Sequence, residues 1–575
     1  MKPNSLIPMK VFTASSQDNA RARQQAINAL PPVLTLQDNL ITYTSQGHLL
    51  ILGPEDLIRL AAAQLSGLKS ITLLAMGQVS SQSDEHLEKA LAAVPELTPI
   101  YLPLESLTGW LGSYHLQLKS PQGDIVNPAK LYTGKDTFDM VLDLNPEPTL
   151  AAEMSPPGYF HIAADSDHLV QAIEEISSLV GEFEKPEYVQ VNHDICAHSD
   201  RGKLGCTRCL DVCPADAITS HNRTDTHDFQ ISVDVHLCHG AGSCTTACPT
   251  GALTFAAPRP QSQLDRLRHY LDSYRQAGGE HPAILIHAEH TDIDLEALPT
   301  HVLPVALEEA AGIGAELWLA LLVQGATYVA IAVDEETPPS LQRLLKDEIK
   351  LTGRLLTALG HPAQRLSLVD VAFLDTDLAE LEDAVAPWRG MPEGPSYPYQ
   401  GKRKTLNEAL DRLYEQGDAD DAIVTLPMGS PYGQVQVDVD ACTLCMSCVA
   451  ICPTSALHSG KDQSPRLSFL EGDCVQCGLC ERACPEQAIQ LEARFAPAAG
   501  IRGEPRVMKE EEPFHCISCG KAFATQSTIK KISQKLEAHP YFQGDAAKRL
   551  HMCEDCRVRD SYRELAADPE AQLRL

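Results

Sequence analysis

The chain has 575 residues, with 46 Lys and Arg against 77 Asp and Glu, a formal net charge of −31 and 44% hydrophobic residues. This hydrophobic content excludes a mostly disordered chain, and the length predicts about three to five domains. The negative charge excludes nucleic acid as a primary partner, because a polyanion would be repelled.

The N-terminus and the cysteines indicate the compartment. Residues 1–17 contain no apolar stretch long enough for a signal peptide, and the longest uncharged run, 317–333, is shorter than the roughly 20 residues that span a bilayer. The 19 cysteines are odd in number, clustered, and absent before Cys196, a pattern typical of metal ligation rather than disulfides. We expect a cytoplasmic protein without membrane insertion.

The region 1–185 is predicted to be an N-terminal α/β domain. Short apolar runs alternate with a helical pattern, as in a parallel sheet covered by helices. Strands are expected at 48–53, 69–74 and 138–143, and a helix at 55–65.

Cysteines then recur in four blocks, and each block ends in Cys-Pro. The blocks form two pairs, separated by a long cysteine-free stretch. An alternating strand pattern precedes the first cysteine of three blocks, which supports a true repeat. The blocks begin at Cys196, Cys238, Cys442 and Cys474.

The downstream pair, within 434–495, has the spacing Cys-x2-Cys-x2-Cys-x3-Cys-Pro twice. This spacing lets three thiolates reach one iron–sulfur cube, while the fourth points to the partner cluster. The region resembles the bacterial two-cluster ferredoxins. Zinc is the alternative, but zinc sites rarely show this spacing. The resemblance implies one [4Fe–4S] cluster on Cys442, Cys445, Cys448 and Cys484, and another on Cys474, Cys477, Cys480 and Cys452.

The upstream pair, within 186–257, is predicted to be a second ferredoxin-like module that departs from this pattern twice. Nine residues, instead of two, separate Cys196 from Cys206, which we interpret as an inserted loop. The strand pattern before Cys196 indicates that this cysteine still fills the first position. One [4Fe–4S] cluster is therefore expected on Cys196, Cys206, Cys209 and Cys248.

The second departure is Ala241, which stands where another cysteine belongs. Three thiolates remain for this site: Cys213, Cys238 and Cys244. Three interpretations stay open: a [3Fe–4S] cluster, an atypical [4Fe–4S] cluster with a ligand such as His239, or a site that has lost its cluster. The first two are favoured, because the three cysteines keep their spacing.

The region 258–386 is predicted to be a second α/β domain, again from alternating strand and helix patterns. Strands are expected at 283–287, 301–305 and 327–333, and helices at 306–324 and 339–359. The segment 387–433, with four prolines at its start, is predicted to be a linker.

Other motifs in the α/β regions are weak. No glycine-rich phosphate loop is present, so a nucleotide site has no support. Gly312 and Gly314 lack a third glycine and are interpreted as packing positions. His287 and His290 follow a strand, where functional loops often lie, but they are interpreted as loop residues rather than ligands.

The region 496–575 is predicted to be a small zinc-ribbon-like domain. Two Cys-x2-Cys pairs predict one structural Zn²⁺, and the long segment between them predicts an inserted helix at 525–536. A fifth iron–sulfur site is the alternative. His515 and His551 flank the pairs and could be alternate ligands, but the favoured interpretation is that they face solvent. The expected ligands are Cys516, Cys519, Cys553 and Cys556.

Two wider resemblances concern partners. Residues 280–372 resemble the small delta subunit associated with methyl-viologen-reducing hydrogenase and heterodisulfide reductase, in Val302-Leu-Pro-Val-Ala306 and Gly325-Ala-Thr-Tyr-Val-Ala-Ile331. That family carries cysteines here and this sequence has none, so the region is expected to dock partners without carrying electrons. The whole chain resembles the multi-cluster ferredoxin proteins of bacteria, some of which accompany formate dehydrogenases.

The sequence thus predicts an α/β and α+β multidomain chain, in which two α/β domains alternate with two two-cluster ferredoxin modules and a zinc-ribbon-like domain follows. The cofactors would be three [4Fe–4S] clusters, one [3Fe–4S] or atypical [4Fe–4S] cluster, and one Zn²⁺. We expect an electron-transfer protein rather than an enzyme, serving a redox partner such as formate dehydrogenase. The alternatives are an oxidoreductase subunit whose open cluster binds substrate, and an assembly factor that delivers clusters or sulfur to a dehydrogenase.

Overall fold

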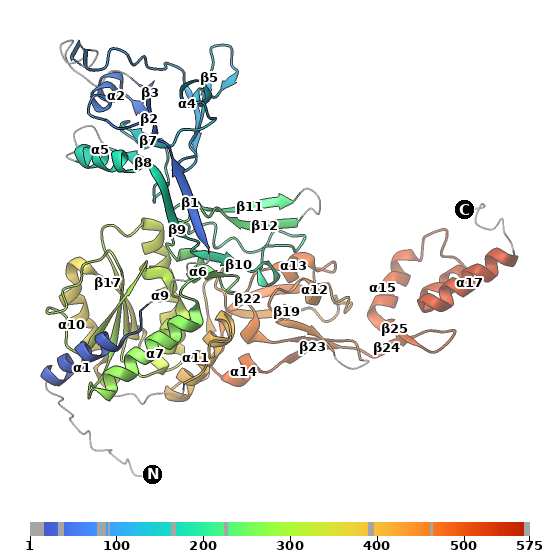
Figure 1. Cartoon of the computed structure of the whole chain (residues 1–575). Helices are drawn as coiled ribbons and strands as arrows, with labels where there is room; N and C mark the ends of the chain where they lie inside the picture. The colour runs from blue at the N-terminus through green and yellow to red at the C-terminus, as the bar shows by residue number, and fades with distance from the viewer. Residues whose placement is uncertain are drawn as a thin grey trace.

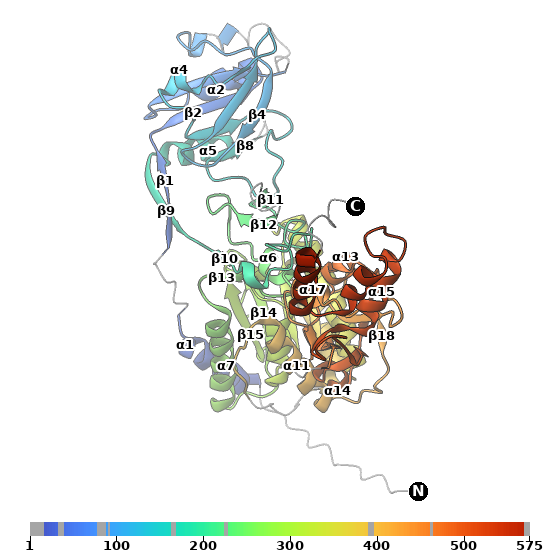
Figure 2. The same ribbon diagram turned by 90° about the vertical axis from the view of Figure 1, so that its right-hand side faces the viewer.

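The structure of the chain is a computed structural model (Figure 1). It describes residues 16–32, 39–77, 88–89, 92–162, 168–223, 228–388, 396–460 and 464–567. The N-terminal sheet stands apart from the other domains, and a two-stranded ribbon joins it to them (Figures 1 and 2).

The N-terminal sheet is parallel, with strand order β3-β2-β7-β8. Strand β2 (His48–Gly53) is buried along its whole length, as expected for a strand covered on both faces. Helices α2 and α5 pack on one face, and a small antiparallel sheet, β4-β5-β6, packs on the other. The bounds are β3 (Ser70–Ala75), β7 (Met140–Asp143), β8 (Tyr159–His161), α2 (Glu55–Ala62), α5 (His168–Ser178), β4 (Leu104–Thr108), β5 (His115–Lys119), β6 (Ile125–Val126) and α4 (Ala129–Thr133).

The joining ribbon pairs β1 (Leu40–Ser45) with β9 (Gly181–Pro186) in antiparallel register. Helix α1 (Ser16–Ala29), although it precedes this ribbon, belongs to the central domain. Its buried residues Ala22 and Ala26 lie four positions apart on one face, and the helix packs against α7 (Pro260–Gln276). Arg23 fixes it by donating to the carbonyl oxygens of Leu295 at 2.7 Å and Pro299 at 3.0 Å. The region 1–185, expected as one domain, therefore contributes a helix to another.

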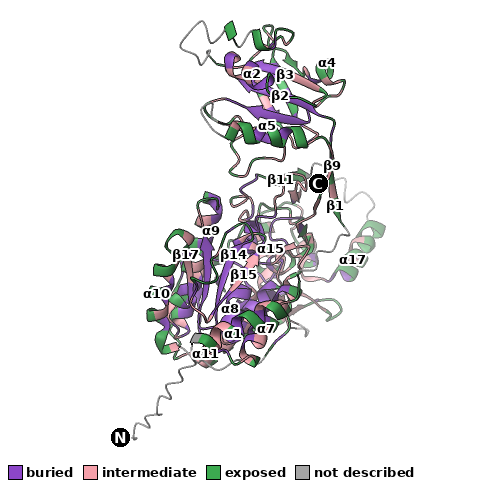
Figure 3. Ribbon diagram, turned by 60° about the vertical axis from the view of Figure 1, so that its left-hand side comes forward, coloured by how far each residue is buried: buried purple, intermediate pink, exposed green. Residues whose placement is uncertain are grey.

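The central sheet is also parallel, with strand order β15-β14-β16-β17. Figure 3 shows its strands as the buried centre of this domain. The helix expected from residue 306 begins only at Ala315, because Gly312 and Gly314 disfavour an α-helix. Strand β15 continues to Leu307, and a single 3₁₀ turn, Ala310–Gly312, lies between the strand and the helix. The bounds are β14 (Ala283–Ala288), β15 (Val302–Leu307), β16 (Val329–Val333), β17 (Leu366–Asp370), α8 (Ala315–Val323), α9 (Pro339–Ala358) and α10 (Leu374–Val385).

Helix α11 (Lys402–Gln416) lies inside the segment predicted to be a linker. Its buried face, Leu406, Leu410 and Leu413, joins the core of the central domain and packs against α8. Residues 402–416 are therefore part of a folded domain, whereas residues 389–395 of the same segment lie outside the described ranges.

The two cysteine modules have short antiparallel strands and very short helices. In the upstream module β10 (Val189–Val191) pairs with β13 (Leu253–Phe255), β11 (Ile218–Arg223) pairs with β12 (Asp228–Val233), and α6 (Ser243–Ala247) lies between. In the downstream module β22 (Ile489–Phe495) pairs with β19 (Gly433–Val437) and β18 (Val424–Thr425). A second sheet there contains β20 (Leu457–Ser459), β21 (Arg466–Phe469) and β23 (Arg506–Glu510), with α12 (Ser447–Ile451), α13 (Leu479–Ala483) and α14 (Ala499–Gly503).

The C-terminal region begins with the hairpin β24 (Pro513–His515) and β25 (Ala522–Thr525). Helix α15 (Gln526–Leu536) follows, which confirms the predicted inserted helix, and α16 (Asp545–Lys548) and α17 (Glu554–Ala567) complete it. In the described part of the chain, no helix is both long and apolar enough to cross a membrane.

The docking of α1 gives a first prediction. Replacing Arg23 with Ala removes a buried cation that donates to several carbonyl groups, each of which then loses a partner. Hydrogen exchange of the α1 amides should become faster by about 10-fold or more. Arg21→Ala is the control, since Arg21 is exposed on the same helix and pairs with Asp18. Equal exchange in the two variants would contradict this role of Arg23.

Candidate metal centres

The downstream module contains two cavities, each lined by four cysteines. One, of about 350 Å³, is lined by Cys452, Cys474, Cys477 and Cys480. The other, of about 340 Å³, is lined by Cys442, Cys445, Cys448 and Cys484. In both cavities the fourth cysteine comes from the other block, which is the exchange that the Cys-Pro spacing implied.

Backbone geometry prepares these cavities for anionic sulfur. Leu444, Met446 and Gln476 have positive φ angles of 55°, 61° and 53°, so the loops curl around the cavities. The Leu444 amide donates to the sulfur of Cys442 at 3.4 Å, and the Ala488 amide donates to Cys484 at 3.3 Å. N–H donors of this kind stabilise thiolate ligands and tune cluster potential.

Burial acts in the opposite direction on the metal-free thiols. It raises the pKa of Cys448 to about 12, and the neighbouring thiols of Cys442, Cys445 and Cys484 add to the rise. It also raises the pKa of Cys477 to about 12, although the backbone amide of Leu479 lowers it. Metal binding here must therefore release protons, because the ligand is the thiolate. A thiol-lined cavity with N–H donors fits an iron–sulfur cluster.

In the upstream module, Cys206, Cys209 and Cys248 gather around Cys196. Burial raises the pKa of Cys209, and the nearby thiols of Cys248, Cys206 and Cys196 raise it further. Cys196, Cys209 and Cys248 are all buried in the same cluster of side chains. The structure thus brings together the four residues expected to share a cluster.

The inserted loop 197–205 folds back, so that Cys206 returns to Cys196. The Cys206 amide donates to the Ala197 carbonyl oxygen at 3.0 Å. Gly205 allows this closure, because a Cβ atom there would lie 1.8 Å from the same oxygen. His198 and Ser199 attach the loop to the neighbouring strands. His198 Nε2 lies 2.7 Å from Ser220 Oγ. The Ile231 amide donates to Ser199 Oγ at 3.1 Å.

The incomplete set Cys213, Cys238 and Cys244 also comes together. Burial raises the pKa of Cys244 well above its usual range, with Cys238 and Cys213 the next contributors. Ala241, which stands at the position of the missing cysteine, is buried, with 8% of its surface exposed. The Nε2 atom of His239 is buried and has no hydrogen-bond partner among the residues that the structure describes.

Side chains from the N-terminal domain and its ribbon cover this incomplete set. Lys185 donates to the carbonyl oxygens of His236 at 2.7 Å and Cys238 at 2.8 Å. The Tyr43 hydroxyl donates to the same His236 oxygen at 2.5 Å, and the Trp110 ring stacks on His236 with centroids 4.6 Å apart. Sequence reasoning missed these residues, because they lie far away in the chain and belong to no motif.

The two modules face each other where Cys206 lies close enough to Cys477 for their thiols to interact electrostatically. Neighbouring residues of α11 fasten this junction. Lys402 donates to the carbonyl oxygens of Thr245 and Thr246 in the upstream module, at 2.6 and 2.8 Å. Arg403 donates to those of Gly472 and Cys474 in the downstream module, both at 2.7 Å. Sequence reasoning missed this pair too, although its amphipathic helix was readable after Gly401.

The C-terminal thiols of Cys516, Cys519, Cys553 and Cys556 all lie within 4.8 Å of one another. No other group of three or more His, Cys, Asp or Glu ligand atoms comes so close anywhere in the described ranges. In a tetrahedral site with Zn–S bonds of about 2.3 Å, the sulfurs lie about 3.8 Å apart, so the spacing fits a single ion. His551 contacts Ser533 Oγ at 3.2 Å, and neither it nor His515 belongs to this group.

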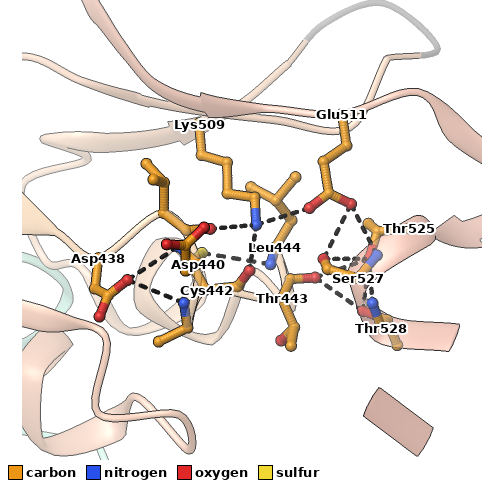
Figure 4. A network of polar contacts seen from close by, with 12 residues as sticks. Asp438, Asp440, Cys442, Thr443, Leu444, Lys509, Glu511, Thr525, Ser527 and Thr528 are labelled. Atoms are coloured by element: carbon orange, nitrogen blue, oxygen red, sulfur yellow. Dashed lines mark hydrogen bonds and ion pairs between the residues drawn. The ribbon is translucent and has the colours of Figure 1, made fainter. Parts of the chain in front are cut away.

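The C-terminal region docks on the downstream module beside Cys442 (Figure 4). The hydroxyls of Thr525 and Thr528 both donate to the Thr443 carbonyl oxygen at 2.8 Å. Lys509 donates to the Cys442 carbonyl oxygen and pairs with Glu511 at 2.7 Å, and Glu511 accepts from the Ser527 amide at 3.0 Å. Sequence analysis did not predict this contact.

The packing interpretation of Gly312 is confirmed, since a Cβ atom on Gly242 would lie 2.7 Å from its Cα atom. His287 is buried in β14 rather than in a loop, where its Nδ1 contacts the Ala288 carbonyl oxygen at 2.9 Å. His290 follows β14, and its Nε2 lies 3.9 Å from Asp334.

Both cysteine modules are similar to known proteins. Residues 204–252 and 441–489 each match a family model described as a 4Fe–4S dicluster domain. A 7Fe ferredoxin of Hydrogenibacillus schlegelii is 43% identical over 47 residues, 8% of this chain and 55% of the relative. Ferredoxin-1 of Caulobacter vibrioides is 29% identical over 90 residues, 12% of this chain and 77% of the relative. An uncharacterised ferredoxin of Methanocaldococcus jannaschii is 34% identical over 65 residues, 11% of this chain and 82% of the relative.

The closure of the inserted loop gives a second prediction. Gly205→Ala would force the backbone at Ala197 to move and displace Cys206. The purified protein should then lose about four iron atoms per chain, one cluster, in iron and sulfide analysis. Gly500→Ala is the control, because a Cβ atom there has open space around it. Full iron content in the Gly205 variant would show that the loop does not position Cys206.

Proposed function

The chain belongs to the ferredoxin family of 4Fe–4S dicluster proteins, and we propose that it transfers single electrons between a dehydrogenase-type partner and another redox carrier. Bound [4Fe–4S] clusters supply that one-electron chemistry. The observation that carries the proposal is the gathering of fifteen cysteines into four sets, with Cys206 and Cys477 at the junction between modules.

The chain's own residues would define the order of the sites. Cys445 is exposed, unlike the other fourteen cysteines of the four sets, so its set is proposed as the one nearest to an external partner. The Cys474 set follows and meets the Cys206 set at the junction, held by Lys402 and Arg403. The incomplete set around Cys244 would be the innermost site, beneath Lys185.

For the incomplete set we propose a [3Fe–4S] cluster. Three thiolates can each bind one of three irons. The Hydrogenibacillus relative is named a 7Fe ferredoxin, and seven irons are one fewer than two [4Fe–4S] cubes contain. A [4Fe–4S] cluster with His239 as a ligand is the alternative, supported by the buried, unpaired Nε2 atom of that side chain among the described residues.

Formate dehydrogenase is the proposed dehydrogenase, on the resemblance of the whole chain to the proteins that accompany it. The delta-subunit-like region 280–372 is proposed to dock a partner without carrying electrons, since it contains no cysteine. A substrate-binding open cluster is disfavoured, because Tyr43, Trp110 and Lys185 cover the incomplete set. Nothing in the geometry favours a cluster-delivery role.

For the C-terminal thiols we propose one structural Zn²⁺. The support is that the four thiol sulfurs lie close enough together to bind one ion. Structural zinc sites have four protein ligands and no open position. The contacts of Thr525 and Thr528 with Thr443 would then hold a zinc-stabilised domain against the outermost site.

Metal counting tests the electron-transfer proposal. Anaerobically purified protein should contain about 15 iron atoms per chain with a three-iron cluster, about 16 with a fourth cube and about 12 if the incomplete set is empty. Oxidised protein should show a [3Fe–4S] EPR signal only in the first case. Cys445→Ala should lose or convert one cluster and slow electron exchange with an added carrier. Unchanged iron, EPR spectrum and exchange rate in this variant would refute the assignment.

The zinc proposal has its own test in the full chain. Cys553→Ser removes one of four closed ligands, so bound zinc should fall by about one ion per chain while iron stays constant. Hydrogen exchange of residues 513–567 should become faster, because folding there depends on the metal. His551→Ala is the control and should keep its zinc. Iron loss in the Cys553 variant would indicate a fifth cluster instead.

A further inference from the structure

A cavity lies where the central α/β domain meets the upstream module. Its walls come from α6 and β13 of that module, the start of α7, the loop between β15 and α8, and the start of α11. Most of the wall is apolar, with Phe255, Ile313 and Leu317 among its residues. This lining is typical of small-molecule sites, which combine apolar walls with a few polar groups.

Gln263 of α7 is the unusual polar group in this wall. The side chain is only 2% exposed, and its Nε2 and Oε1 atoms are both buried without a hydrogen-bond partner among the residues described. A buried amide normally satisfies both atoms, because leaving them unpaired is costly. The side chain therefore offers one donor and one acceptor, side by side, to whatever occupies the cavity.

A second buried group has a free acceptor. Glu316, in the first turn of α8, is 6% exposed, and its Oε2 atom accepts no hydrogen bond from the described residues. The nearest cation, Lys402, lies 3.7 Å from that oxygen, but its ammonium group already donates to two carbonyl groups of the upstream module.

The charge of the wall disfavours a phosphate-bearing ligand. Glu308, Glu309 and Glu316 are acidic, and Lys402 is the single basic residue in the lining. The surplus of negative charge would repel an anion. An uncharged ligand meets no such penalty.

We propose that this cavity binds an uncharged planar heterocycle that carries a lactam or imide edge. The C=O of that edge would accept from Gln263 Nε2, and its N–H would donate to Gln263 Oε1. The rings would lie against Phe255 and Ile313. The ligand would then sit on α6, the helix that carries Cys244, since Thr245 also lines the cavity.

Lumiflavin is the probe for this proposal, because it has an imide edge, three fused rings and no phosphate. Equilibrium dialysis against the holoprotein should show saturable binding at one site per chain. N3-methyl-lumiflavin, which lacks the imide N–H, should bind about 10-fold more weakly or worse. FMN should also bind more weakly, because its phosphate meets the acidic wall.

Two protein variants separate the proposed contact from general effects. Gln263→Leu should reduce lumiflavin affinity about 10-fold or more. Gln276→Leu makes the same change at the exposed end of the same helix and should bind like the wild type. Iron content and EPR spectra of both variants should match the wild type, so a loss of clusters would be recognised as a separate failure.

The proposal is overturned if the wild-type protein, with all its clusters, does not bind lumiflavin. It is also overturned if N3-methylation leaves the affinity unchanged, a comparison that needs no variant and holds even if Gln263→Leu fails to fold. None of these outcomes affects the proposed electron transfer, which is judged from iron counting and electron exchange.

Discussion

Two adjacent cations, Lys402 and Arg403, hold the cysteine modules together. Each is buried, and each donates to backbone carbonyls of a different module. A buried cation is costly unless it is fully hydrogen-bonded, so this geometry is stable only while both modules keep their positions. The ring of Tyr432 supports Arg403, with the guanidinium carbon 4.9 Å from its centroid. The closeness of Cys206 to Cys477 depends on this arrangement.

The same helix links the modules to the main hydrophobic core. Leu406, Leu410 and Leu413 pack with α8, which lies beside the central parallel sheet. One face of α11 is apolar and packs in the core, and its first two residues are cations that bind the two modules. The helix therefore positions the modules relative to the core. The central domain thus has a structural role for the modules that needs no cysteine of its own.

The N-terminal and C-terminal parts contact two different thiol sets. Lys185, Tyr43 and Trp110 lie over the incomplete set, whereas Thr525 and Thr528 contact the carbonyl next to Cys442. Both contacts are made mainly to backbone carbonyls. Such contacts fix the position of a loop without depending on its side chains.

The sequence by itself determined the sets of thiols. Cysteine spacing is a local property, and the resemblance to two-cluster ferredoxins that it supports implied Cys474, Cys477, Cys480 and Cys452 as one group, which the cavity around them reproduces. Strand and helix periodicity likewise predicted both parallel sheets. Only the tertiary structure decided how these parts meet: α1 on the central domain, α11 as a core helix instead of a linker, and Gln263 in the wall of an apolar cavity. These features depend on contacts between residues far apart in the chain, and such contacts leave no periodicity or spacing to read.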